Sequence, residues 1–520
     1  MSAVNGSGTS NRVVAILESL RAKGIRLWTS EGQLHYEAPK GALGSNDIQE
    51  LRSAKDQLIT LLERIGTAEA NEPQLIERKC ADRAPFSFSQ QAHWNLYHLS
   101  DKPSFCQVLS VTSVGGRLDI GVLQDSLTEM VRRHEILRTR IVIFEGVPIQ
   151  KMEQSADCLL QFEDLECLPV ENRESEVSHV VERILLQPVN VHSLPVIRAQ
   201  LLKIRDDAHV LIVSIEHLFA DQYSMSLLLR DLFSTYFSKL IGATPSLPSI
   251  TMQFADFANW QRQSSSSWYT RHRAYWEPRL RVYGRQPFPV EGALTLPGDS
   301  QWELIHFDID KKMTADLRAW CKSRYTTLVL SVFTAYAALV LRWCKTTKAI
   351  FPYEIDGRVS PKIENTIGYF ASVLYLEIDL PDGASMDALL KQIKERYCDA
   401  YEHADSSYIE ALIPRPEFTR NGLFNWASHG PSISHSLPSD CVELLSFEPF
   451  PVDPRIKSNL HRDTEPIMFF IEGTEAILGG FQFQAARLSS SAAQRFIQCF
   501  QIFLRTLLTQ PERRIDEIPC

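Results

Sequence analysis

Leu211-Ile212-Val213-Ser214-Ile215-Glu216-His217-Leu218-Phe219-Ala220-Asp221-Gln222-Tyr223-Ser224 is the stretch that decides the fold. Its apolar, β-branched first half predicts a buried strand, which ends abruptly at His217. A histidine held at the end of a buried strand is a candidate general base. The alternative is a core histidine whose ring is satisfied by a backbone carbonyl, which is the commoner role for a single histidine.

The same stretch resembles the HHxxxDG signature of nonribosomal peptide synthetase condensation domains. Glu216 stands at the first histidine of that signature, His217 at the second, Asp221 at the aspartate and Gln222 at the glycine. Other segments match further elements of the family in the family's order. They are Ser87-Phe88-Ser89-Gln90-Gln91-Ala92-His93-Trp94 for Ser-x-x-Gln-x-x-x-Trp, Arg133-His134-Glu135-Ile136-Leu137-Arg138-Thr139 for RHExLRT, Phe254-Ala255-Asp256-Phe257-Ala258-Asn259-Trp260-Gln261 for Tyr-x-Asp-Tyr-Ala-x-Trp-Gln, and Gly357-Arg358 with Ile367-Gly368-Tyr369-Phe370 for the late pair.

This resemblance implies an α/β fold with two chloramphenicol-acetyltransferase-like lobes that form a V around a central tunnel. We expect the lobes at residues 83–265 and 266–520, after a polar linker at 67–82. The sequence has nothing like a phosphopantetheine attachment motif, adenylation signatures or a thioesterase GxSxG elbow. We therefore expect a free-standing condensation enzyme.

Residues 1–66 have a pattern of their own. An apolar helical repeat that stops at Gly24 precedes two alternating segments around Ser30-Glu31-Gly32-Gln33, which predict a β-hairpin. Ser45 is expected to cap a second helix. The segment resembles the TubC-like docking domain, which implies that the hairpin binds the C-terminal tail of an upstream carrier protein by strand addition. The candidate docking residues are Arg26, Trp28, Lys40 and Arg52. The alternative is that these charges form only a solvated face.

Composition sets the remaining limits. A net charge of −9 argues against non-specific nucleic-acid binding, which needs a concentrated basic surface. The longest apolar run, Leu328 to Leu341, is shorter than the ~20 residues of a membrane span and predicts a buried helix. No secretory signal is visible, and the 10 cysteines have no metal-ligand spacing and no disulfide framework. We therefore expect a cytoplasmic monomer without a metal or a resident cofactor, whose substrate arrives on the phosphopantetheine of a carrier protein.

The expected chemistry centres on His217, as the base or hydrogen-bond acceptor that orients an attacking amine or hydroxyl. The resemblance implies that Asp221 turns away and pairs with Arg358, so both are expected to brace the loop of His217. Glu216 would raise the pKa of His217 if the two side chains were close, but adjacent strand residues face opposite sides.

Two departures from the family pattern bear on the substrate. Gln222 replaces a glycine whose amide could approach an oxyanion, and Ala371-Ser372-Val373 replaces Val-Asn-Thr. Glu216, Gln222 and Ser372 are therefore candidate contributors to the tunnel or to an oxyanion site, and these departures point to an atypical acceptor. Two functions stay open. One is acyl transfer from a carrier thioester to an amine or hydroxyl, with chain release as one outcome. The other is a degenerate module that only docks carriers or recruits partner enzymes.

Overall fold

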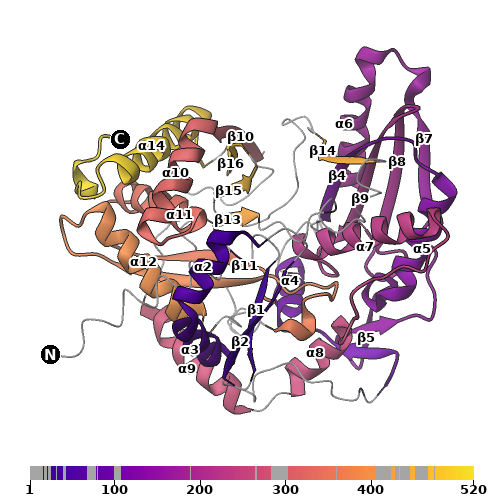
Figure 1. Cartoon of the computed structure of the whole chain (residues 1–520), viewed down its shortest axis with the longest axis horizontal. Helices are drawn as coiled ribbons and strands as arrows, with labels where there is room; N and C mark the ends of the chain where they lie inside the picture. Colours follow the sequence, from indigo (N-terminus) through magenta and orange to yellow (C-terminus); the bar gives the residue numbers. More distant parts are fainter. Residues whose placement is uncertain are drawn as a thin grey trace.

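The computed structural model describes residues 25–30, 32–38, 43–66, 80–98, 107–187, 189–263, 266–282, 302–358, 360–401, 423–427, 445–450, 466–473, 475–485 and 487–520, together with residues 16, 20, 78, 403 and 433. Figure 1 shows two halves, each built from helices and strands, beside each other. The N-terminal hairpin and its helices, in indigo, are drawn over the junction. The predicted α/β fold class is confirmed.

The larger sheet of the N-terminal half places the strand that ends at His217. Its order is β14-β4-β9-β8-β7. Side chains of β9 alternate between two faces: Leu211 and Val213 join the core with α5 and α7, whereas Val210 and Ile212 pack with α6. The elements are β4 (Gln107–Gly115), β7 (Leu160–Asp164), β8 (Ile197–Arg205), β9 (Ala208–Glu216), β14 (Ser446–Pro449), α5 (Ile120–Arg133), α6 (Val170–Leu186) and α7 (Gln222–Leu240).

A smaller sheet with order β3-β6-β5 completes this half. Near it lie two helices. One, α4, contains most of the motif at residues 87–94, and the other, α8, contains the motif at residues 254–261. They contact each other, since the side chain of Gln261 in α8 accepts a 2.8 Å hydrogen bond from the backbone N–H of Phe88 in α4. The elements are β3 (Arg83–Pro85), β5 (Thr139–Phe144), β6 (Val147–Met152), α4 (Phe88–His98) and α8 (Phe254–Gln263); α9 (Ser266–Val282) follows in the chain.

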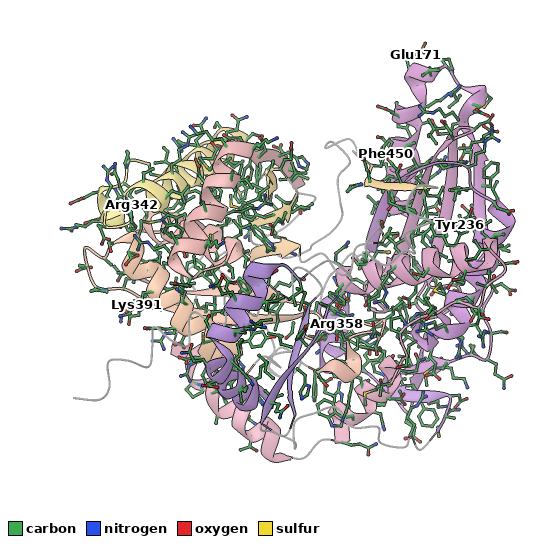
Figure 2. All side chains as sticks on the ribbon, in the orientation of Figure 1. Glu171, Tyr236, Arg342, Arg358, Lys391 and Phe450 are labelled. Carbon is green, nitrogen blue, oxygen red and sulfur yellow. A yellow bond between two sulfur atoms is a disulfide. The ribbon has the colours of Figure 1, made fainter. Side chains whose placement is uncertain are left out.

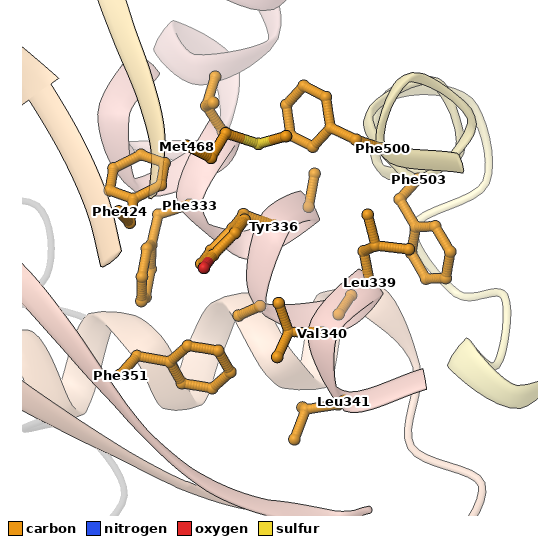
Figure 3. Close-up of a cluster of buried hydrophobic side chains, with 14 of the residues drawn as sticks. Phe333, Tyr336, Leu339, Val340, Leu341, Phe351, Phe424, Met468, Phe500 and Phe503 are labelled. Atoms are coloured by element: carbon orange, nitrogen blue, oxygen red, sulfur yellow. The ribbon is translucent and has the colours of Figure 1, made fainter. Parts of the chain in front are cut away.

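The C-terminal half is a six-stranded sheet in the order β10-β16-β15-β13-β11-β12. Its core surrounds α11, where every residue from Val329 to Leu341 is buried, as predicted for this apolar run. Figure 3 shows Phe333 and Tyr336 of α11 among side chains from the sheet and from α14. The elements are β10 (Trp302–Ile309), β11 (Lys348–Ile355), β12 (Ser372–Asp379), β13 (Leu423–Ala427), β15 (Ile467–Glu472), β16 (Ile477–Gln484), α10 (Lys311–Arg324), α11 (Leu328–Trp343), α12 (Met386–Tyr401) and α14 (Ser490–Thr509).

One strand crosses between the halves. β14 lies between β13 and β15 in the sequence, yet it pairs antiparallel with β4 at the edge of the N-terminal sheet. Phe447 of β14 packs on Phe233 of α7 with ring centroids 4.4 Å apart. Figure 1 shows β14 in yellow-orange beside the purple β4. The C-terminal half therefore contributes a strand and apolar side chains to the N-terminal half.

The N-terminal hairpin forms as predicted, from β1 (Arg26–Ser30) and β2 (Gln33–Glu37). The helix after it differs from the prediction in two ways. It is two helices, α2 (Ser45–Ser53) and α3 (Lys55–Gly66), and Gly44 rather than Ser45 is the N-cap. The side chain of Asp47 accepts a 2.8 Å hydrogen bond from the Gly44 N–H, which leaves Ser45 as the first helical residue. Most of the predicted first helix and of the 67–82 linker lies outside the described residues.

Two further findings concern the whole chain. Cys499 and Cys520 form a disulfide with Cα atoms 5.2 Å apart, a pairing that the cysteine spacing did not predict. It joins α14 to the C-terminal residue. No single described helix is long and apolar enough to cross a membrane, although α10 and α11 together reach that length and composition across a 101° bend.

Candidate active site

His217 lies directly after β9, at the point where the sheet ends. Its Nδ1 is 2.9 Å from the backbone carbonyl oxygen of Ala220. A carbonyl oxygen only accepts, so Nδ1 carries the hydrogen and Nε2 keeps its lone pair. The residue is partly exposed.

The surroundings of His217 favour its neutral form. Packed protein around the imidazole lowers the pKa of His217 below its ordinary value, because a charge there would lose hydration. The negative charge of Asp221 acts in the opposite direction and is outweighed. His217 is therefore neutral near pH 7, which is the protonation state that a general base needs.

Asp221 does not point at the reacting position. Its carboxylate is buried and accepts five hydrogen bonds, from the backbone N–H groups of Ser224, Phe370 and Ala371 and twice from Arg358. Burial alone would raise the pKa of Asp221, but Arg358 and the backbone donors outweigh it and the pKa lies below its ordinary value. Asp221 is also the N-cap of α7, so it fixes the loop from His217 to the helix.

Arg358 provides the other half of this brace, from the segment between β11 and β12. Its side chain is almost completely buried, with Nη1 and Nη2 2.9 and 3.1 Å from the Asp221 oxygens. Nη2 also donates to Ser224 Oγ at 2.7 Å. The guanidinium lies over the rings of Tyr223 and Phe370. These bonds join the N-terminus of α7 to the segment between β11 and β12, and so link the two halves. Figure 2 labels Arg358 near their junction.

Two glycines near Arg358 allow the backbone to pack closely against Phe370 and Phe254. Gly357 has a φ of +66°, and a side chain there would overlap the Phe370 carbonyl oxygen. Gly368 packs directly against the ring of Phe254, and its N–H and carbonyl both bond Ser224 Oγ, at 3.0 and 2.7 Å. Sequence analysis did not single out Ser224, although its position one helical turn after Asp221 places it beside the cap.

Glu216 points to the opposite face of β9 from His217. It is completely buried on the face shared with Arg198, and neither of its carboxylate oxygens has a hydrogen-bond partner among the described residues. Burial raises the pKa of Glu216 well above its ordinary value, against the opposing charge of Arg198. The carboxylate whose charge acts on the pKa of His217 is that of Asp221, and Glu216 is not among the groups that shift it.

The remaining predicted residues lie in different surroundings. Gln222 is exposed and is the first residue of α7, three residues from Met225 whose N–H bonds the Asp221 carbonyl. Ser372 is buried as the first residue of β12, opposite Ile355. Arg52 is exposed on α2, and Arg26 and Trp28 lie on β1 with side chains that are not described. Lys40 lies outside the described residues.

Two rings beside His217 were missed by sequence analysis. Tyr369 lies 4.6 Å from the His217 ring and His93 lies 5.5 Å from it, measured between ring centroids. His93 is also 5.6 Å from Tyr369, so the three rings form a closed group. Both residues stand inside quoted motifs, but at positions that those motifs leave open, which is why the pattern gave no signal.

Comparison with known proteins identifies the family. The model of the condensation domain matches residues 80–519, and the model of the TubC N-terminal docking domain matches residues 13–64. The chain belongs to the condensation-domain family. Among curated relatives of this condensation domain, gramicidin S synthase 2 from Brevibacillus brevis is 24% identical over 449 residues, which are 84% of the chain and 10% of the synthase. A linear gramicidin synthase protein from Brevibacillus parabrevis is also 24% identical over 449 residues, which are 9% of its length. The chain thus spans about a tenth of the length of these relatives.

Solved structures share the fold of this condensation domain. SgcC5 from Streptomyces globisporus, solved with a naphthyl ethanediol and sucrose, has a TM-score of 0.70 at 18% identity and covers 83% of the chain with all of its own length. The EpoB cyclization-docking bidomain from Sorangium cellulosum has a TM-score of 0.68 at 18% identity, covering 96% of the chain and 98% of the bidomain. The X-domain from teicoplanin biosynthesis, solved with OxyB, has a TM-score of 0.66 at 20% identity, covering 86% of the chain and 98% of its own.

Proposed function

We propose that the chain transfers an acyl group from the phosphopantetheine thioester of a carrier protein to an amine or hydroxyl acceptor. His217 is the catalytic residue. The membership of the condensation-domain family supports the reaction class, and the observation that carries the proposal is the position of His217 directly after β9, with its Nδ1 bonded to the Ala220 carbonyl.

The proposed reaction needs one proton acceptor and no metal. His217 Nε2 takes the proton from the acceptor nitrogen or oxygen as that atom bonds to the thioester carbon. The tetrahedral intermediate then collapses, the carbon–sulfur bond breaks, and the proton on Nε2 passes to the departing thiolate. The products are an amide or an ester and the free phosphopantetheine thiol. His217 returns to its starting form with its Nδ1–H still on the Ala220 carbonyl.

Asp221 and Arg358 are positioning residues in this proposal. Their ion pair is buried and joins the loop after β9 to the segment before β12. A displacement of His217 by even an ångström would weaken catalysis, because proton transfer depends on hydrogen-bond distance. The brace therefore supports the base without touching substrate.

We infer that residues 1–66 dock an upstream carrier protein through a short C-terminal segment. The described residues add no third strand to the β1–β2 hairpin, and an edge strand of this kind can accept an extended peptide. The match to the TubC docking domain supports this role. The exposed Arg52 and the candidate residues Arg26, Trp28 and Lys40 suit an acidic peptide.

A second candidate function is a module that binds partners without acyl transfer. Two observations favour it: Glu216 stands where the family has a histidine, and the X-domain solved with OxyB has the same fold. The retained set of His217, Asp221 and Arg358 favours transfer, since a buried polar network is costly to keep satisfied.

The test incubates the full chain with acyl-loaded carrier protein and a panel of amines and alcohols, and reads the products and the carrier by intact mass. Acyl loss from the carrier with matching gain by an acceptor supports transfer. Stable acyl-carrier, in the presence of measurable carrier binding, would instead support the second candidate. His179→Ala is the matched control, because that histidine is exposed on α6 and bonds Glu176 within its own helix turn.

A further inference from the structure

The Ser-x-x-Gln motif forms a capping box at the start of α4. The Oγ of Ser87 accepts a 3.1 Å hydrogen bond from the Gln90 N–H, and the Oε1 of Gln90 accepts a 3.0 Å bond from the Ser87 N–H. Each side chain thus satisfies an N–H group that the helix leaves without a partner. The box uses only the acceptor oxygen of the Gln90 amide, so a glutamate would serve it equally well. Both amide hydrogens of Gln90 are left for other partners.

These hydrogens connect α4 to another part of the N-terminal half. The Nε2 of Gln90 lies 3.0 Å from the carbonyl oxygen of Leu218 and 3.4 Å from the Oε1 of Gln150 in β6. Gln150 in turn donates to the Pro85 carbonyl at 2.7 Å. Gln90 and Gln150 are both completely buried, where an unbonded amide would be costly. A carbonyl only accepts, so the contact with Leu218 fixes which end of the Gln90 amide carries the hydrogens.

Leu218 lies in the turn that holds His217. It follows His217 directly, and the turn closes where the His217 Nδ1 bonds the Ala220 carbonyl at 2.9 Å. Asp221 fixes the far end of this turn as the N-cap of α7, and Gln90 holds its middle. Leu218 is buried, so loss of the Gln90 donor would leave its carbonyl short of a hydrogen bond and would favour a shift of the turn.

We propose that Gln90 is a positioning residue for His217. Through the Leu218 carbonyl, it holds the turn in the geometry that keeps the Nδ1 hydrogen of His217 on the Ala220 carbonyl. A neutral imidazole has two tautomers, and only the one with its hydrogen on Nδ1 gives Nε2 the lone pair that a base needs. The effect of Gln90 on transfer rests on the proposed function, whereas its effect on the tautomer is measured without any transfer.

The test reads the ring nitrogens of His217 in the full chain by proton–nitrogen correlation NMR, at about pH 9 where histidine is neutral. In the wild-type protein we expect the pattern of one tautomer, with the hydrogen on Nδ1. Gln90→Met removes the donor at similar side-chain volume and should give the averaged signals of two tautomers. Gln90→Glu keeps the capping box but as a carboxylate has no hydrogen to donate, so it should change the pattern too. It carries the test if Gln90→Met does not fold.

Two controls separate this role from helix capping. Ser87→Ala removes the acceptor for the Gln90 N–H and leaves the bond to Leu218, so it should lower the melting temperature and keep the wild-type ring pattern. Gln91→Met makes the same substitution one residue further along α4, where Gln91 bonds Asn95, and should also keep that pattern. Wild-type signals in the folded Gln90 variants, or an equal change in Ser87→Ala, would overturn the proposal.

The effect on transfer is read as a single-turnover rate with an acyl-loaded carrier. Gln90→Met should slow transfer about three- to tenfold, the effect of one hydrogen bond, with carrier binding unchanged. In a His217→Ala background it should cause no further loss, because Gln90 acts only through His217. A further loss of the same size would overturn the proposal. Absence of transfer in the wild-type protein would contradict the proposed function, and the ring pattern would still decide the role of Gln90.

Discussion

At the scale of single residues, Asp221 and Arg358 form a buried ion pair in the site. Removal of either Asp221 or Arg358 would leave a buried charge without its partner. We expect Asp221→Ala and Arg358→Ala each to lower the free energy of unfolding by about 3 to 5 kcal/mol, and the double variant to lose less than the sum. Denaturant unfolding of the four proteins measures this. The exposed pair Arg324–Asp387 is the control and should cost under about 1 kcal/mol. Additive losses would contradict a direct pair.

The pKa of His217 gives a pH prediction. It is lowered by burial, so the base stays neutral down to a pH below its ordinary value of about 6.5. The transfer rate should therefore be flat through neutral pH and fall only when acid protonates Nε2, with a midpoint below about 6.5. A pH profile of kcat/KM measures the midpoint. A midpoint above the ordinary histidine value would show that His217 is not held in its neutral form.

Glu216 gives a second pH prediction, which concerns folding stability: its contribution to stability should fall as pH rises. Its folded pKa is raised above the unfolded value of about 4.3, so its stabilising protonated form is fully present below that value. This contribution is lost as pH rises through the folded pKa. Glu216→Gln cannot ionise, so it should melt above wild type near pH 8, with a smaller difference near pH 4. Thermal unfolding at both pH values tests this, with the exposed Glu171→Gln as control. Equal melting curves near pH 8 would argue that the carboxylate is solvated.

At the scale of elements, the sequence predicted well where the pattern is local. The apolar run before His217 is strand β9, the run from Leu328 is the buried helix α11, and the residues around Gly32 form a hairpin. Ser45 was predicted as the N-cap, but it is the first residue of α2, and Gly44 is the N-cap, with its N–H bonded by the side chain of Asp47. An N-cap depends on which nearby side chain reaches the free N–H groups, and several polar residues there could do so.

Features that depend on distant segments were not predictable. The pairing of β14 with β4 joins strands more than 300 residues apart, and no period in the sequence indicates such a partner. The His93–His217–Tyr369 group has the same origin, since its rings come from α4, from the loop after β9 and from the segment before β12. The pairing of Asp221 with Arg358 was expected only through the family resemblance.

The conformation of the segment before β12 requires a glycine at position 357, and this gives a prediction at the scale of the element. Gly357 and Gly242 have similar positive φ angles of +66° and +68°, but a Cβ would overlap the Phe370 carbonyl at Gly357 and meets nothing within 4 Å at Gly242. Gly242→Ala should cost about 1 to 2 kcal/mol from backbone strain alone. Gly357→Ala should cost clearly more and should slow transfer, because Arg358 moves with it. Equal losses in chemical unfolding would contradict the close approach.

At the scale of the whole molecule, residues 1–66 are proposed to deliver the carrier rather than to take part in chemistry. Their own small core supports this separation, with Leu51, Ala54, Leu58 and Leu62 buried against Ile25. Deletion of 1–66 should leave a folded enzyme that needs more carrier, because docking raises the effective concentration. Transfer at saturating carrier should be nearly unchanged, and Arg52→Glu should shift the carrier requirement in the same direction. An unchanged rate at low carrier concentration would contradict the docking role.

The central claim is that His217 is the base of an acyl transfer, and His217→Ala tests it most directly. The measurement is single-turnover transfer from an acyl-loaded carrier, alongside carrier binding and thermal unfolding, with His179→Ala as control. We predict a loss of roughly a hundred- to ten-thousandfold in the transfer rate, the usual contribution of one general base, with carrier binding and folding retained. A folded His217→Ala protein that transfers the acyl group at the wild-type rate would contradict the account.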